Sequence, residues 1–218
     1  MADLSKLSEL IQVTPSKQTH WENVYTAKGE DEVSWFQETP APSLELLERV
    51  GVKPAAALID VGGGASRLVD CLLARGFGNI TVLDLSAAAL AAARMRLGRT
   101  GDKVKWIVAD AAEWRSDETY DLWHDRAAFH FLTQAQDQQA YIRRLKQSLR
   151  RGGHVIIGTF APDGPATCSG LPVARHNAES LSTLLGDDFV LADTRRHEHT
   201  TPWKSVQKFQ FSTFHYAE

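Results

Sequence analysis

The stretch AALIDVGGGAS, residues 56–66, decides the fold of this chain. Its apolar half is short and ends directly in three glycines, which predicts a buried parallel strand followed by a tight turn. A helix is expected next, over about residues 66–75, with Gly76 and Gly78 after it. A strand that turns through glycine into a helix is the repeating unit of α/β folds.

The same alternation continues along the chain. Ser86 is expected to cap an alanine-rich helix that Gly98 ends. Further strands are predicted at 80–84, 104–110, 120–125 and 154–160, with helices over 86–97 and 133–149. This order predicts an α/β, Rossmann-like, doubly wound and mostly parallel seven-stranded sheet with right-handed crossovers.

The two ends of the chain break this pattern. Residues 189–197 and 204–215 alternate like an antiparallel hairpin at the C-terminus, after a Pro/Gly-rich loop over 161–176 and a short helix at 178–185. Residues 1–43 are expected to form a cap or lid segment, and residues 44–218 the main domain. Ser43 is expected to cap the first helix of that domain.

The glycine turn allows two kinds of cofactor site. Gly62 and Gly64 fit the first two positions of a dinucleotide fingerprint, G-x-G-x-x-G, but Arg67 stands at the third. A long side chain at that position should obstruct close packing of helix on strand. The sequence therefore disfavours a nicotinamide cofactor.

Polar residues stand at the ends of three later strands, at Asp84, at Asp110 and in the run His124-Asp125-Arg126. A carboxylate at Asp84 can accept both hydroxyls of a ribose, although a helix cap is the alternative and Ser86 competes for that role. Asp110 and the backbone of Ala111 can contact the edge of an adenine. Carboxyl ends of parallel strands meet at one edge of a sheet, so a ligand site is expected there.

With these residues the chain resembles the class I S-adenosylmethionine-dependent methyltransferases over roughly residues 44–160. Residues 60–66 match the family's D-x-G-x-G motif, and Arg151 replaces proline in its L-x-P-G-G turn at 149–153. The resemblance implies S-adenosylmethionine as cofactor. The cofactor-binding residues it implies, together with neighbouring candidates, are Trp21, Tyr25, Trp35, Asp60, Gly62, Gly63, Gly64, Ser66, Asp84, Leu85, Asp110, Ala111 and Asp125.

Three of those residues belong to the aromatic N-terminal segment. Trp21, Tyr25 and Trp35 resemble a segment that folds over the cofactor in some bacterial members of the family. The alternative is that these side chains fill a surface groove.

The methyl group of a sulfonium is already activated, so positioning is the protein's main task and a base is needed only for a protonated acceptor. His124, Asp125 and His130 are the candidate catalytic residues, with a core histidine as the alternative for His130. The loop at 161–176 is expected to form part of the acceptor pocket. His197 and His199 share a strand face, but without a third ligand no metal is expected.

The leading function is methylation of a small molecule. A protein-lysine methyltransferase and a non-catalytic adenosylmethionine-binding partner stay open as alternatives. A net charge of −3 excludes the basic footprint of nucleic-acid binders. Two cysteines, no secretory signal and no apolar run of membrane-spanning length favour a cytoplasmic protein, acting as monomer or dimer.

Overall fold

A computed structural model describes residues 16–217. Its central sheet has seven strands in the order β3-β2-β1-β4-β5-β9-β8. The first five run parallel, and β9 and β8 add an antiparallel hairpin at one edge. The strands are β1 (Leu58–Val61), β2 (Ile80–Asp84), β3 (Val104–Val108), β4 (Tyr120–Arg126), β5 (Leu149–Phe160), β8 (Phe189–Thr200) and β9 (Val206–Tyr216). The predicted fold class is confirmed.

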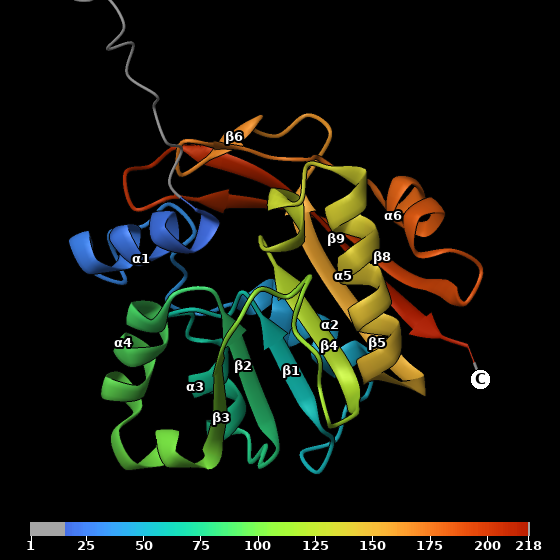
Figure 1. The fold of residues 1–218 in the computed structure, drawn as a ribbon, viewed down its shortest axis with the longest axis horizontal. Helices are drawn as coiled ribbons and strands as arrows, with labels where there is room; N and C mark the ends of the chain where they lie inside the picture. Colours follow the sequence, from blue (N-terminus) through green and yellow to red (C-terminus); the bar gives the residue numbers. More distant parts are fainter. Residues whose placement is uncertain (1–15, 218) are drawn as a thin grey trace, which may run out of the picture.

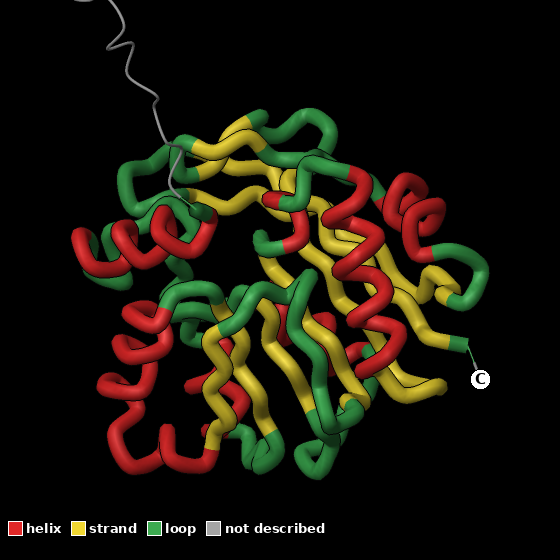
Figure 2. Tube along the Cα trace, viewed as in Figure 1, coloured by secondary structure: helices red, strands yellow, loops and turns green. Residues whose placement is uncertain are grey.

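Helices cover both faces of this sheet (Figures 1 and 2). They are α1 (Lys17–Ala27), α2 (Ala41–Arg49), α3 (Leu68–Ala74), α4 (Ala87–Leu97), α5 (Ala135–Ser148) and α6 (Ala178–Leu185), with short 3-10 turns at Gly98–Lys103 and Phe129–Phe131. Side chains of α2, α3 and α4 pack on one face, and side chains of α5 and α6 pack on the other.

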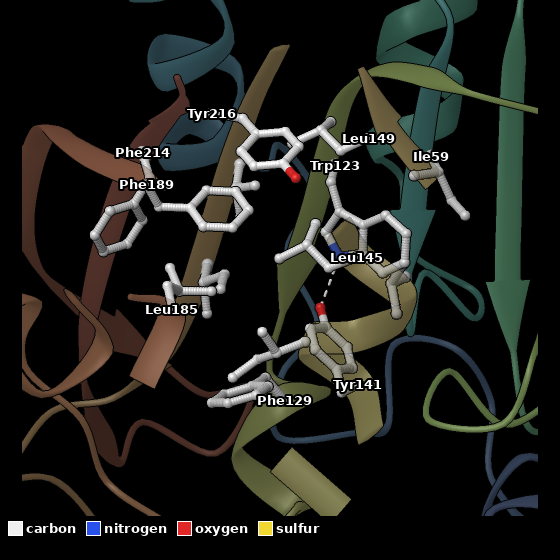
Figure 3. Close-up of a cluster of buried hydrophobic side chains, with 14 of the residues drawn as sticks. Ile59, Trp123, Phe129, Tyr141, Leu145, Leu149, Leu185, Phe189, Phe214 and Tyr216 are labelled. Carbon is white, nitrogen blue, oxygen red and sulfur yellow. Dashed lines mark hydrogen bonds between the residues drawn. The ribbon is translucent and has the colours of Figure 1, made fainter. Parts of the chain in front are cut away.

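Successive side chains of β4 alternate between these two layers. Leu122 packs with the α2–α4 layer, whereas Trp123 packs with the α5–α6 layer, where its indole N–H donates to the hydroxyl of Tyr141 at 2.7 Å (Figure 3). This alternation also sends the polar residues at the end of β4 in opposite directions.

Several predicted boundaries moved. Residues 149–153 belong to β5 instead of a turn, and the register between β4 and β5 shifts where Gly152 adopts a φ of +78°. The third strand ends at Val108, because Asp110 starts a turn by accepting the N–H of Ala112 at 2.8 Å. The loop at 161–176 contains a small hairpin of β6 (Thr167–Cys168) and β7 (Leu171–Pro172).

The two predicted helix caps have different outcomes. Ser86 caps α4, since its hydroxyl accepts the N–H of Ala89 at 3.1 Å. The cap predicted at Ser43 is wrong, because α2 begins at Ala41 after Pro40 and Ser43 lies inside the helix. The boundary predicted between the cap or lid segment (residues 1–43) and the main domain (residues 44–218) therefore falls within α2.

Candidate functional site

The glycine turn after β1 is enclosed on both sides. Gly62 has a φ of +67°, and a Cβ on it would stand 2.4 Å from the Cβ of Ala128. Gly64 has a φ of +48°, and a Cβ there would stand 2.9 Å from the hydroxyl of Tyr25 and 3.1 Å from a carboxylate oxygen of Asp84. Only glycine therefore lets this turn fit between the end of β4 and the N-terminal segment.

A cavity of about 270 Å³ opens beside this turn, at the carboxyl ends of β1, β2 and β4. Helix α1 and the β6–β7 hairpin lie beyond these strand ends (Figure 1). Eight of the cofactor-binding candidates line the cavity: Trp21, Tyr25, Trp35, Gly62, Asp84, Leu85, Asp110 and Ala111. Residues more than 60 positions apart in sequence thus meet at the edge where a doubly wound sheet holds its ligands.

Asp84 is a buried acid of the cavity wall with a shifted pKa. Its carboxylate accepts the N–H of Ser86 at 2.8 Å. Burial raises its pKa to about 7, with a further rise from the charge of Asp60, although the N–H groups of Ser86, Gly64 and Leu85 oppose the increase. Ser86, not Asp84, caps α4, so the carboxylate of Asp84 remains available at the cavity wall.

Aromatic side chains of the N-terminal segment form another wall. The ring of Trp21 packs edge-on against Trp35 and Phe131, at centroid distances of 5.6 and 4.8 Å. The indole of Trp35 donates to the hydroxyl of Tyr25 at 3.0 Å. Burial raises the pKa of that phenol, so it stays protonated near neutral pH.

Polar contacts hold this segment against the domain. Glu22 on α1 accepts the hydroxyl of Ser86 at 2.8 Å and the N–H of Ala88 at 3.2 Å, both at the start of α4. Arg67 pairs with Glu30 at 3.0 Å and also with Glu38. The side chain of Arg67, which stands at the third glycine position of the dinucleotide fingerprint, thus points away from the turn and pairs with the N-terminal segment.

His124, on β4, does not line the cavity. Its exposed fraction is 2%, and its Nδ1 and Nε2 are hydrogen-bonded to Asp60 at 2.7 Å and to Ser43 at 2.8 Å. Both ring nitrogens are occupied by the protein, and Asp60 is equally buried. This geometry favours a structural role for the pair over the base predicted at His124 and the cofactor contact predicted at Asp60.

Asp125 points to the opposite face of the sheet and is fully buried. It accepts the hydroxyl of Tyr141 at 2.6 Å and the N–H groups of Ala128 and Phe129 at about 3.0 Å. Burial raises its pKa to about 6, against the effect of these donors. Asp125 therefore stabilises the turn after β4 from the side of the sheet that α5 covers. It does not line the cavity, so this geometry favours a structural role over the predicted contact with cofactor or acceptor.

His130 is also fully buried, between the rings of Phe131 and Phe160. Burial, with the nearby charge of Arg126, lowers its pKa to about 3, so it stays neutral. It lies outside the cavity wall, and this position favours the core-histidine interpretation over a catalytic one.

The remaining glycine-motif residues lie behind the cavity. A Cβ on Gly63 would approach a carboxylate oxygen of Asp60 to 2.7 Å, so the residue packs on the core side of the turn. The hydroxyl of Ser66 accepts the N–H of Leu68 at 3.1 Å, at the start of α3. Both residues support the turn without lining the cavity.

Several cavity residues were not predicted. They are Lys17, Leu83, Ala109, Arg126, Ala127, Ala128, Phe131, Leu132, Thr133 and Tyr141. A signal existed for Arg126, because it completes the polar run His124-Asp125-Arg126 at a strand end. Cys168, Leu171 and Pro172 also line the cavity, and they belong to the loop at 161–176, which was expected to form part of the acceptor pocket.

Within residues 16–217, no cluster of three or more His, Cys, Asp or Glu side chains is arranged to hold a metal ion. His199 instead donates from Nε2 to the carbonyl of Ser34 at 2.8 Å. Cys71 and Cys168 are both free thiols. None of the helices in this described part has the length and apolar character that a membrane crossing requires.

Comparison with known proteins agrees with this geometry. Residues 58–153 match the model of a methyltransferase domain family. A trans-aconitate 2-methyltransferase of Variovorax paradoxus is 34% identical over 162 residues, which are 68% of this chain and 59% of that protein. The chain thus spans under two thirds of that relative's length.

Solved structures share the fold over most of the chain. The N-methyltransferase NodS of Bradyrhizobium japonicum, in complex with S-adenosylhomocysteine, has a TM-score of 0.69 at 18% identity, covering 90% of this chain and 98% of that one. A methyltransferase of Anabaena variabilis has a TM-score of 0.73 at 15% identity, covering 93% and 96%. The chain therefore belongs to the class I S-adenosylmethionine-dependent methyltransferases, and residues 58–153 carry the matched domain.

Proposed function

We propose that this protein is an enzyme that transfers a methyl group from S-adenosylmethionine to a small-molecule acceptor. One observation carries the proposal: the glycine turn, the acids at the ends of β2 and β3, and the aromatic N-terminal segment line a single cavity. Relatives support it, since NodS is described in complex with S-adenosylhomocysteine and the Variovorax relative is described as acting on trans-aconitate.

The residues present fit this cofactor. Asp84 offers a buried carboxylate for the hydroxyls of a ribose, and Asp110 with Ala111 borders the space expected for the adenine. Gly62 and Gly64 let the backbone approach the ligand where any Cβ would clash. When bound, S-adenosylmethionine supplies an activated methyl group with a neutral thioether as leaving group.

The chain's own contribution is to bind, orient and exclude water. Trp21, Trp35 and Phe131 cover the cavity with apolar surface, which strengthens the electrostatic interactions inside it. No histidine is among the described residues that line the cavity, and burial raises the pKa of the Cys168 thiol to about 11. The arrangement therefore suits an acceptor that arrives already deprotonated, for which positioning is the main source of rate enhancement.

A labelled-methyl experiment with the full chain tests this function. Calorimetry first measures binding of S-adenosylhomocysteine, and tritiated S-adenosylmethionine is then incubated with the protein and either metabolites or lysate proteins. Label in small molecules is the expected result. Label confined to protein lysines would instead select the protein-methylating alternative, and binding without any transfer would select the non-catalytic one.

A further inference from the structure

Arg126, the last residue of β4, is a guanidinium that the protein leaves partly unbonded. Its Nη1 donates to the carbonyl of Trp35 at 2.9 Å. Its Nε and Nη2 are buried and have no partner among residues 16–217. These two nitrogens share one edge of the planar guanidinium, the edge that pairs with a carboxylate through two parallel hydrogen bonds. The side chain lines the cavity.

The protein also leaves the charge of Arg126 uncompensated. No acid in the described chain forms an ion pair with it, and the nearby Asp60 is already bonded to His124. Burial lowers the pKa of Arg126 to about 10, so the group stays cationic at neutral pH. Its other close neighbour is the ring of Phe209, 5.0 Å away. A buried charge without a partner is costly, which marks the place where a ligand charge belongs.

The backbone of Arg126 lies two strands away from that of Asp84 in the sheet. The strand order places β1 between β4 and β2, so the ends of β2 and β4 are about 10 Å apart at the usual spacing of ~4.8 Å between strands. Tyr25 and Asp60 are near its side chain, and its proximity to Trp35, Phe209 and Cys168 places it beside the N-terminal segment, β9 and β6. This is the side of the cavity that the β6–β7 hairpin covers.

We propose that Arg126 binds an anionic group of the methyl acceptor, so that the acceptor is a small carboxylic acid or a similar planar oxyanion. This inference rests on the proposed function. The aromatic wall of Trp21, Trp35 and Phe131 selects an acid with an apolar body. A protonated lysine would meet the unpaired guanidinium and be repelled, so the same group acts against protein-lysine acceptors.

The amino-acid part of the cofactor carries a carboxylate as well, and this group is the alternative partner for Arg126. Two ligands separate these partners: S-adenosylhomocysteine carries that carboxylate, and methylthioadenosine lacks it. If Arg126 binds the acceptor, the Arg126→Gln variant keeps wild-type affinity for both ligands. If it binds the cofactor instead, the variant loses affinity for S-adenosylhomocysteine alone, which would overturn the proposal.

The experiment uses the full chain, tritiated S-adenosylmethionine and a metabolite extract separated by ion exchange into anionic, neutral and cationic pools. Wild-type protein is expected to label the anionic pool. Arg126→Gln should lower kcat/KM for that pool roughly 10- to 100-fold, because it removes charge-assisted hydrogen bonds. Arg126→Lys keeps the charge but not the paired donors and should lie between. Arg143→Gln, on the exposed face of α5, is the matched control and should match wild type.

Folding does not obscure the result, because replacing an unpaired buried charge with an amide should leave the melting temperature equal or higher. Label found only in the neutral or cationic pool would overturn the inference while leaving the methyltransferase intact. Equal activity of Arg126→Gln and Arg143→Gln on the anionic pool would overturn it as well. Transfer to none of the pools would contradict the proposed function itself, and the inference with it.

Discussion

Replacing Asp84 by asparagine is expected to stabilise the free protein while it weakens cofactor binding. Burial raises the pKa of this carboxyl from 3.8 to about 7, so the folded state holds an ionised group at a site that disfavours charge. A tenfold change in proton affinity is about 1.4 kcal/mol, which puts the upper limit of this cost near ~4 kcal/mol. The amide is also desolvated, so the expected gain in unfolding free energy is roughly 1–3 kcal/mol.

The pH dependence has a definite sign. Between about pH 4 and pH 7 the folded state holds a proton on Asp84 that the unfolded chain has released, so this group makes wild-type stability rise as the pH falls. Asparagine does not titrate. The advantage of Asp84→Asn should therefore be largest above pH ~7 and should vanish near pH ~4.

Cofactor binding should change in the opposite direction. An amide accepts hydrogen bonds from ribose hydroxyls more weakly than a carboxylate, by ~1–1.5 kcal/mol, so the Kd for S-adenosylhomocysteine should rise about tenfold. Urea unfolding at several pH values and calorimetry measure the two effects. The exposed Asp117, changed to asparagine, is the control and should alter neither. A stability loss at pH ~8, or unchanged cofactor affinity, would refute this account of Asp84.

Three further outcomes are expected. S-adenosylhomocysteine at 100 times its Kd should stabilise the protein by ~2.7 kcal/mol in a thermal melt, and NAD should not; stabilisation by NAD alone would contradict the cofactor assignment. Deleting residues 1–38 should leave a domain with folded circular dichroism that binds S-adenosylmethionine weakly, because Trp21, Tyr25 and Trp35 are lost from the cavity wall; full affinity in the truncated domain would exclude a lid. His124→Ala should lower the unfolding free energy by about 1–3 kcal/mol, since Asp60 and Ser43 lose a buried partner, while the folded fraction keeps its activity; a selective loss of kcat with unchanged stability would restore His124 as a base.

The layout of the fold could be predicted because its signals are local. A buried strand that ends in glycine, as at residues 58–64, is determined by neighbours within a few positions. The acids Asp84 and Asp110 could be proposed for the same reason, since each is the last residue of a predicted strand and strand ends meet at one edge. Boundaries shifted where Gly152 allows a register change that no local pattern indicates.

The sequence by itself determined the α/β class, the strand ends that hold the acids, and the glycine turn that only residues without a Cβ can form. The tertiary structure alone decided which polar groups face the cavity. His124 is satisfied by Ser43, 81 residues away, whereas Arg126 keeps two nitrogens without a partner among residues 16–217, where its hydrogen bond goes to the carbonyl of Trp35. Whether a side chain is free to bind a ligand depends on desolvation and on partners distant in the chain, and local periodicity carries neither.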